Sequence, residues 1–227
     1  MIQLKKIALI AALSTLIAPQ LEVRSAPPAI QASAGWRQTI YAHAREKLNH
    51  SAWGWRHSER DYLLAREIGR TEPVKFDDDV LFAAAFLHDA GAIPPFALED
   101  VDHAVRSVQL AESLLRQAGF PMAKFPQVRA AILGHMYDEE PTGREAVLLH
   151  DADTLDFLGA TGVARQLSGT PSTGNMDARL ERLRGFILEL PPRLKTRSAR
   201  RMSRERIEIM RQFLHRLDQE TPQGTKL

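Results

Sequence analysis

The dipeptide His88-Asp89 stands at the end of the apolar run Val80 to Leu87. An imidazole and a carboxylate next to a buried segment cost free energy unless they are paired, and a metal ion is an economical partner for both. The chain has no cysteine, which excludes zinc–thiolate sites, iron–sulfur clusters and thiol catalysis. A metal must therefore be held by His, Asp or Glu, a ligand set that suits divalent manganese, iron, nickel, cobalt or zinc.

Further candidate ligands recur along the chain in segments that otherwise bury apolar residues. They are His57, His103, His135, Asp151 and Asp153. Since the chain has only 8 histidines, their distribution over successive predicted helices argues for a shared site. Asp151 and Asp153 do not easily face the same ion, because residues two apart on a helix point roughly 200° apart.

The elements that must position these residues are predicted to be helices, since apolar residues recur at helical spacing and no run alternates as a strand does. The expected helices are 35–48, 56–69, 77–90, 99–117, 126–135, 145–158, 160–167, 176–190 and 198–217. Trp53 and Trp55 lie just before His57, where they could stack on a base or pack in the core. The pattern predicts an all-α fold, one domain of about eight or nine helices over residues 35–220.

The N-terminus has the pattern of an export signal. Lys5-Lys6 precede an apolar run, Ile7 to Ala18, of the length of a signal-peptide core and too short to span a bilayer comfortably. We expect residues 1–34 to be signal peptide and flexible spacer, and 221–227 a disordered tail. The expected location is periplasmic or secreted, with membrane contact only through the signal. An uncleaved anchor or a first helix of the fold is the alternative.

The order His57…His88-Asp89…Asp153 resembles the HD-domain metal-dependent phosphohydrolase superfamily, in its branch of small bacterial hydrolases. The likeness rests on the segments His57-Ser58-Glu59-Arg60, Ala84 to Gly91 and Asp151-Ala152-Asp153-Thr154-Leu155-Asp156. It implies an HD-type helical bundle in which His57, His88, Asp89 and one later aspartate bind a first metal ion. The setting Ala152-Asp153-Thr154-Leu155 favours Asp153. Asp151 then orients a ligand or is solvated.

Two further histidines extend the likeness. Members of the superfamily with two metals carry the order His…His-Asp…His…His…Asp, which His103 and His135 complete, and Asp89 would then bridge the ions. The alternative is one ion, with both histidines contacting phosphate or acting as acid. His135 is followed by Met136 and the chain has no Gly-Tyr-Pro segment, which argues against the family's cyclic-dinucleotide phosphodiesterases.

The resemblance implies hydrolysis of a phosphate ester or nucleotide by metal-activated water. The candidate catalytic residues are Asp89, Arg60, His103 and His135, with Arg60 a phosphate ligand or an ordinary surface charge. The expected partner is a small phosphorylated substrate; the mildly basic net charge of +2 does not indicate a nucleic acid polymer. The alternatives are a metal-dependent lyase, hydratase or di-iron oxygenase, or a non-catalytic metal-stabilised binding protein. No pattern fixes the substrate, the metal or the oligomeric state.

Overall fold

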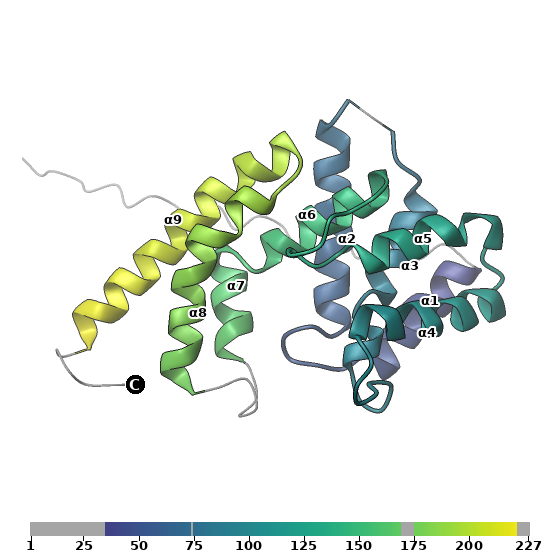
Figure 1. Cartoon of the computed structure of the whole chain (residues 1–227), viewed down its shortest axis with the longest axis horizontal. Coiled ribbons are helices and arrows are strands. Elements are labelled where there is room, and N and C mark those ends of the chain that lie inside the picture. Colours follow the sequence, from purple (N-terminus) through teal and green to yellow (C-terminus); the bar gives the residue numbers. More distant parts are fainter. Residues whose placement is uncertain (1–34, 74, 169–174, 222–227) are drawn as a thin grey trace, which may run out of the picture. The chain divides into compact units, whose positions relative to one another are not determined.

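The computed structural model describes residues 35–73, 75–168 and 175–221. These residues form nine α-helices and no strand, which confirms the predicted all-α fold (Figure 1). The predicted signal peptide and spacer, 1–34, lie outside the described residues, as do residues 222–227 of the predicted tail.

The nine helices are joined by connections of different lengths. They are α1 (Trp36–Lys47), α2 (Trp55–Thr71), α3 (Asp78–Leu87), α4 (His103–Ala118), α5 (Phe125–Leu133), α6 (Arg144–Asp156), α7 (Gly159–Leu167), α8 (Met176–Glu189) and α9 (Arg197–Glu220).

Helix α3 forms the centre of the core. Every residue from Val80 to Leu87 is buried, as expected for a helix that is apolar all round. Helices α1, α2, α4, α5 and α6 all pack against it. Its N-terminus is capped by Asp77, whose carboxylate accepts hydrogen bonds from the backbone N–H groups of Asp79 and Val80. The residues that follow α3 therefore emerge in the middle of the surrounding helices.

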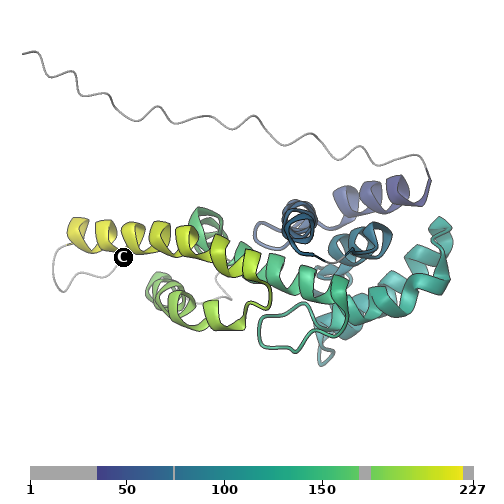
Figure 2. The ribbon, with the colours of Figure 1, turned by 90° about the horizontal axis from the view of Figure 1, so that it is seen from above.

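Helices α2 and α6 pack against each other, and Figure 1 shows that they cross. Helices α7, α8 and α9 pack against one another, and Figure 2 shows them grouped away from α1, α3 and α4. Helix α6 contacts members of both groups, so residues on α2 and α6 lie where the two groups meet.

Several helix boundaries differ from the expected ones. The predicted start of the fourth helix at Glu99 is wrong: α4 begins at His103, because the Asp102 carboxylate caps it by accepting a hydrogen bond from the Val105 N–H. The prediction that His135 lies inside the fifth helix is also wrong, since α5 ends at Leu133. His103 is therefore the first residue of its helix, and His135 lies in the connection after α5.

Among the described residues, no helix is both long enough and apolar enough to cross a membrane.

Candidate metal centre

The six predicted ligands come together from five parts of the fold. His57 lies in the first turn of α2, and Asp153 lies on α6. His88 and Asp89 form the turn after α3, His103 opens α4 and His135 follows α5. The short segment after Asp89 packs closely on α4, because Gly91 donates its N–H to Ser107 Oγ and a side chain at Gly91 would collide with the His103 carbonyl. This contact holds His103 near Asp89.

Three buried histidines, His57, His88 and His135, present Nε2 to the same region. His88 Nδ1 donates a hydrogen bond to the Ala85 carbonyl at 2.8 Å, and His135 Nδ1 donates to the Ile132 carbonyl at 2.6 Å. His57 Nδ1 donates to Asp156 Oδ2 at 2.8 Å. A partner at Nδ1 fixes the ring and leaves Nε2 to coordinate, which is the usual arrangement around a metal-binding histidine.

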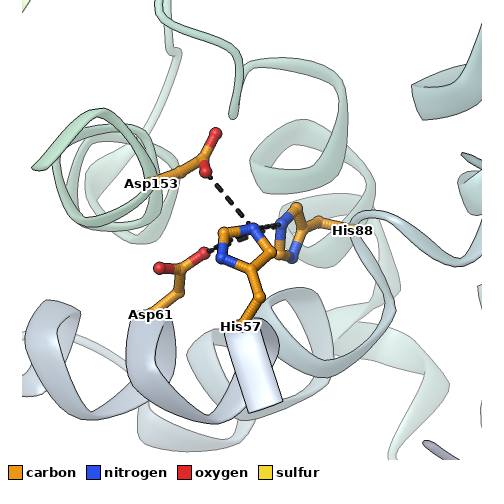
Figure 3. Close-up of side chains that lie close together, drawn as sticks. All are labelled: His57, Asp61, His88 and Asp153. Carbon is orange, nitrogen blue, oxygen red and sulfur yellow. Dashed lines mark hydrogen bonds and ion pairs between the residues drawn. The ribbon is translucent and has the colours of Figure 1, made fainter. Parts of the chain in front are cut away.

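A first group of ligand atoms surrounds His57 Nε2. It lies 3.2 Å from His88 Nε2, 3.3 Å from Asp153 Oδ1 and 3.4 Å from Asp89 Oδ2. Atoms bound at about 2.1 Å to one ion lie roughly 3.0–3.4 Å apart at octahedral or tetrahedral angles. The spacing therefore matches the coordination shell of a single ion. Figure 3 shows that His57, His88 and Asp153 converge, together with Asp61.

A second group shares Asp89 with the first. Asp89 Oδ2 lies 3.4 Å from both His57 Nε2 and His88 Nε2. Its other oxygen, Oδ1, lies 3.5 Å from His135 Nε2 and 3.7 Å from His103 Nε2. The two latter nitrogens are 3.3 Å apart. One carboxylate thus faces two histidine pairs, each with a different oxygen, as a bridging ligand would.

The two candidate aspartates of α6 face different surroundings. Asp151 accepts hydrogen bonds from the N–H groups of Lys195 and Thr196 and from the Thr196 hydroxyl, each at 2.7 Å. Its carboxylate thereby anchors the segment that leads into α9. Asp153 points into the histidine cluster instead. Side chains two residues apart on a helix point in roughly opposite directions, which explains why the two carboxylates have different partners.

Asp156, one turn after Asp153, supports His57 from outside the cluster. Its carboxylate accepts the His57 Nδ1–H and is held by two arginines, through Arg60 Nε and Nη2 at 2.9 and 2.8 Å and Arg165 Nη1 at 3.1 Å. Arg60 lies behind Asp156 and lines a different hollow, with Asn49 and Arg56. In the described part of the chain its side-chain hydrogen bonds go to Asp156 and to the Arg56 carbonyl, so it acts on the cluster through Asp156.

Burial and neighbouring charges shift the pKa values of several groups in the cluster. Burial raises the pKa of Asp61 well above its usual range. Burial and Arg165 oppose protonation of His57, but Asp61, Asp153 and Asp156 outweigh them and raise its pKa. Burial likewise lowers the pKa of His135, yet Asp89 outweighs it and raises the value to about 8.

The donor set fits a divalent cation. Asp153 Oδ1 and both oxygens of Asp61 are buried and accept no hydrogen bond. Buried carboxylate oxygens without donors are costly, and a coordinated ion removes that cost. Imidazole nitrogen and carboxylate oxygen together suit divalent first-row metals. This buried cluster of His and Asp can therefore hold a divalent metal ion.

A cavity of about 340 Å³ opens onto the cluster. Its floor includes Asp89, His103 and Asp153. Its walls carry three hydrogen-bonding side chains and four aromatic rings, namely Arg165, Gln166, Arg182, Trp53, Tyr137, Phe157 and Phe186. The Tyr137, Phe157 and Phe186 rings contact one another edge to face. The cavity thus joins the candidate metal centre to both cationic and aromatic surfaces.

Sequence reasoning missed three residues of this site: Asp61, Asp156 and Arg165. Asp61 follows His57 by four residues, the spacing that places two side chains on one helix face, and this signal could have found it. Asp156 follows Asp153 by three residues in the same way. Arg165 gave no local signal, because only the return of α7 beside α6 brings it to the cluster.

Comparison with known proteins identifies the class. The family model for the HD domain matches residues 54–158, from the start of α2 to the end of α6. A crystal structure of a predicted HD-superfamily hydrolase from an uncultured Thermotogales bacterium is 30% identical, covers 81% of this chain and 91% of its own, and superposes with a TM-score of 0.60. The chain belongs to the HD-domain superfamily, and its structural relatives described as hydrolases indicate an enzyme.

Other relatives share the fold. YpgQ of Bacillus subtilis in complex with ADP is 24% identical, with a TM-score of 0.64 over 82% of this chain and 98% of that one. In sequence the same uncharacterised protein is 30% identical over 89 residues, which span 43% of its length. An HD-superfamily hydrolase from Bacillus thuringiensis is 23% identical, with a TM-score of 0.59 over 82% of this chain and 95% of that one.

Proposed function

We propose that the protein is a metal-dependent phosphohydrolase that cleaves a phosphate ester or phosphoanhydride of a small compound, with nucleotides as the leading class. The observation that carries this proposal is the cavity in which the His/Asp cluster, two arginines and an aromatic wall face one another. The ADP bound by YpgQ of Bacillus subtilis supports the choice of nucleotides. The size of the cavity suits a small molecule.

The residues that hold metal in this proposal are those predicted from the sequence. His57, His88 and Asp153 hold the first ion, and Asp89 contributes Oδ2 to it. His103 and His135, with Asp89 Oδ1, are available to a second ion. Bound divalent ions would polarise the phosphate and lower the pKa of an attacking water.

The chain's own side chains then bind and orient the substrate. Arg165 and Arg182 line the cavity, and guanidinium groups bind phosphate oxygens through several N–H donors at once. Arg165 is buried and lies 3.7 Å from Asp153 Oδ1, close enough to reach a phosphate at the metal centre. Charge held there would stabilise the negative charge that develops on the phosphoryl oxygens.

Arg60 has a positioning role in this account rather than a direct one. It holds Asp156, and Asp156 holds His57 Nδ1. His103 lines the cavity and its side chain is 30% exposed, so it is the histidine best able to exchange a proton with the substrate. This assignment of His103 requires that it does not bind a second ion.

The aromatic wall supplies a surface for the organic part of the substrate. Trp53 stacks on His50 with ring centroids 3.6 Å apart, which fixes its orientation at the cavity. A base or other planar group can stack on such rings, and base–aromatic stacking contributes about 1–3 kcal/mol. Trp55 does not line this cavity; it packs against Tyr41.

The test is phosphate release from nucleotides and from phosphate mono- and diesters by purified protein supplied with manganese, iron, nickel, cobalt or zinc. We expect release with at least one metal and none from the double variant His88→Ala, Asp89→Ala. Glu112→Gln, which changes a surface pair on α4, is the matched control and should keep full activity. Phosphate release that survives the double substitution would exclude the proposed centre.

A further inference from the structure

Asp61 is a buried carboxylate whose presence the predicted ligand set does not explain. It lies on α2 one turn after His57, and its relative exposure is 0%. Neither of its oxygens accepts a hydrogen bond. Since burying an ionised carboxylate without hydrogen-bond donors costs several kcal/mol or more, Asp61 needs a nearby positive charge whenever it is ionised.

The nearest groups to Asp61 are candidate metal ligands. Its Oδ2 lies 3.1 Å from His57 Nε2 and 3.7 Å from His88 Nε2. Ligand atoms of Asp61, His57, His88 and Asp153 all lie within 4.8 Å of one another, so these four residues form a single group. Figure 3 shows the Asp61 side chain directed towards the two imidazoles, across from Asp153. The distance to His57 Nε2 equals that expected between two ligands of one ion.

An ion pair with His57 alone is an insufficient explanation. His57 already donates its Nδ1–H to Asp156, so its charge would be shared among several carboxylates. Four carboxylates gather here, from Asp61, Asp89, Asp153 and Asp156, whereas Arg60 and Arg165 are the two guanidinium groups that pair with them. When the carboxylates are ionised and the histidines are neutral, as metal-binding imidazoles are, two negative charges remain, and one divalent cation neutralises them.

We propose that Asp61 is a further ligand of the ion held by His57, His88 and Asp153. This inference rests on the proposed metal centre and extends it. The first ion then has two imidazoles and three carboxylates, from Asp61, Asp89 and Asp153, within reach. A carboxylate-rich set with more than four ligands suits manganese or ferrous iron better than zinc, which is satisfied by four.

The test compares metal binding by three full-length proteins: wild type, Asp61→Asn and Glu59→Gln. Asparagine keeps the size of the side chain but removes its charge. Glu59 is a carboxylate on the same helix that accepts a hydrogen bond from Tyr41 away from the cluster, so Glu59→Gln is the matched control. Calorimetric titration with Mn²⁺ should show at least tenfold weaker binding for Asp61→Asn and no change for Glu59→Gln. The loss for Zn²⁺ should be smaller.

Equal Mn²⁺ affinity in Asp61→Asn and wild type would overturn the role of Asp61 and leave the metal centre itself intact. Failure of the wild-type protein to bind any of these ions would instead overturn both. A second measurement is the visible absorption spectrum of the Co²⁺-loaded protein. It should differ between wild type and Asp61→Asn, because loss of a ligand changes the coordination of the ion. Identical spectra would contradict the proposal. Should Asp61→Asn fail to fold, Asp61→Ser serves in the same measurements.

Discussion

Asp151 and Asp153 lie two residues apart on α6, and substituting each by asparagine should have different consequences. In Asp151→Asn, one carboxylate oxygen becomes an NH₂ group that faces N–H or O–H donors of Lys195 or Thr196. One or two buried donors then lose their acceptor at about 1–3 kcal/mol each, so we expect a loss of about 2–4 kcal/mol in the free energy of unfolding. For a domain of this size that corresponds to a fall in Tm of roughly 4–16 °C.

Asp153→Asn should affect metal binding more than the stability of the metal-free protein. Asp153 Oδ1 is buried and accepts no hydrogen bond, so asparagine there breaks no hydrogen bond at that atom, although the attraction to His57 and Arg165 is lost. We therefore expect the Tm of chelator-treated Asp153→Asn to fall by less than that of Asp151→Asn. Its affinity for divalent metal should fall by at least about tenfold, as expected when a ligand is lost.

Thermal unfolding with and without chelator, together with Mn²⁺ titration, measures both effects on the same samples. Glu112→Gln serves again as the surface control. The reasoning would be refuted if Asp151→Asn lost metal affinity at unchanged chelated Tm while Asp153→Asn unfolded early and bound metal normally. That result would exchange the roles of the two aspartates.

The remaining predictions concern pH, folding, substrate and location. Because the pKa of His135 is raised to about 8, its proton must leave before an ion binds. Metal affinity should therefore rise as the pH increases from 6 to 8 and then level off. Calorimetry in buffers of different ionisation enthalpy should detect proton release on metal binding at pH 7. Asp77→Ala should lower the free energy of unfolding by about 1 kcal/mol in urea denaturation, since the cap of α3 is lost. Arg182→Ala should raise KM for a nucleotide more than it lowers kcat, if this residue binds substrate away from the reacting phosphate. Cell fractionation of the full-length chain should find it outside the cytoplasm, trimmed within residues 1–34; an untrimmed cytoplasmic protein would contradict the export prediction.

The fold was predictable because its main determinants are local. Residues 80–87 are apolar on every side, and this pattern alone predicts a helix surrounded by others. In the helices that surround α3, apolar residues recur at helical spacing on one face, and polar residues occupy the other. Their ends were less predictable, because capping decides them: Asp102 starts α4 four residues later than the periodicity suggests.

The site was predictable only in part, because sequence order shows which residue types are available and not what they meet. His57, His88 and Asp153 could be proposed from their order, and the structure brings them together. Asp61 follows His57 at the spacing that places both on one helix face, but this spacing alone does not distinguish a buried carboxylate from a solvated one. Arg165 reaches the cluster only through the packing of α7, which no local pattern encodes.

The central claim is that a metal ion in the His/Asp cluster enables phosphate release. The most direct measurement is to strip the protein with chelator and restore Mn²⁺ stepwise, while following bound metal by elemental analysis and phosphate release from a nucleotide in the same samples. Phosphate release should be absent from the stripped protein and rise in proportion to the bound metal. Release that is unchanged by stripping, or full metal loading with oxygen consumption and no phosphate release, would contradict the account.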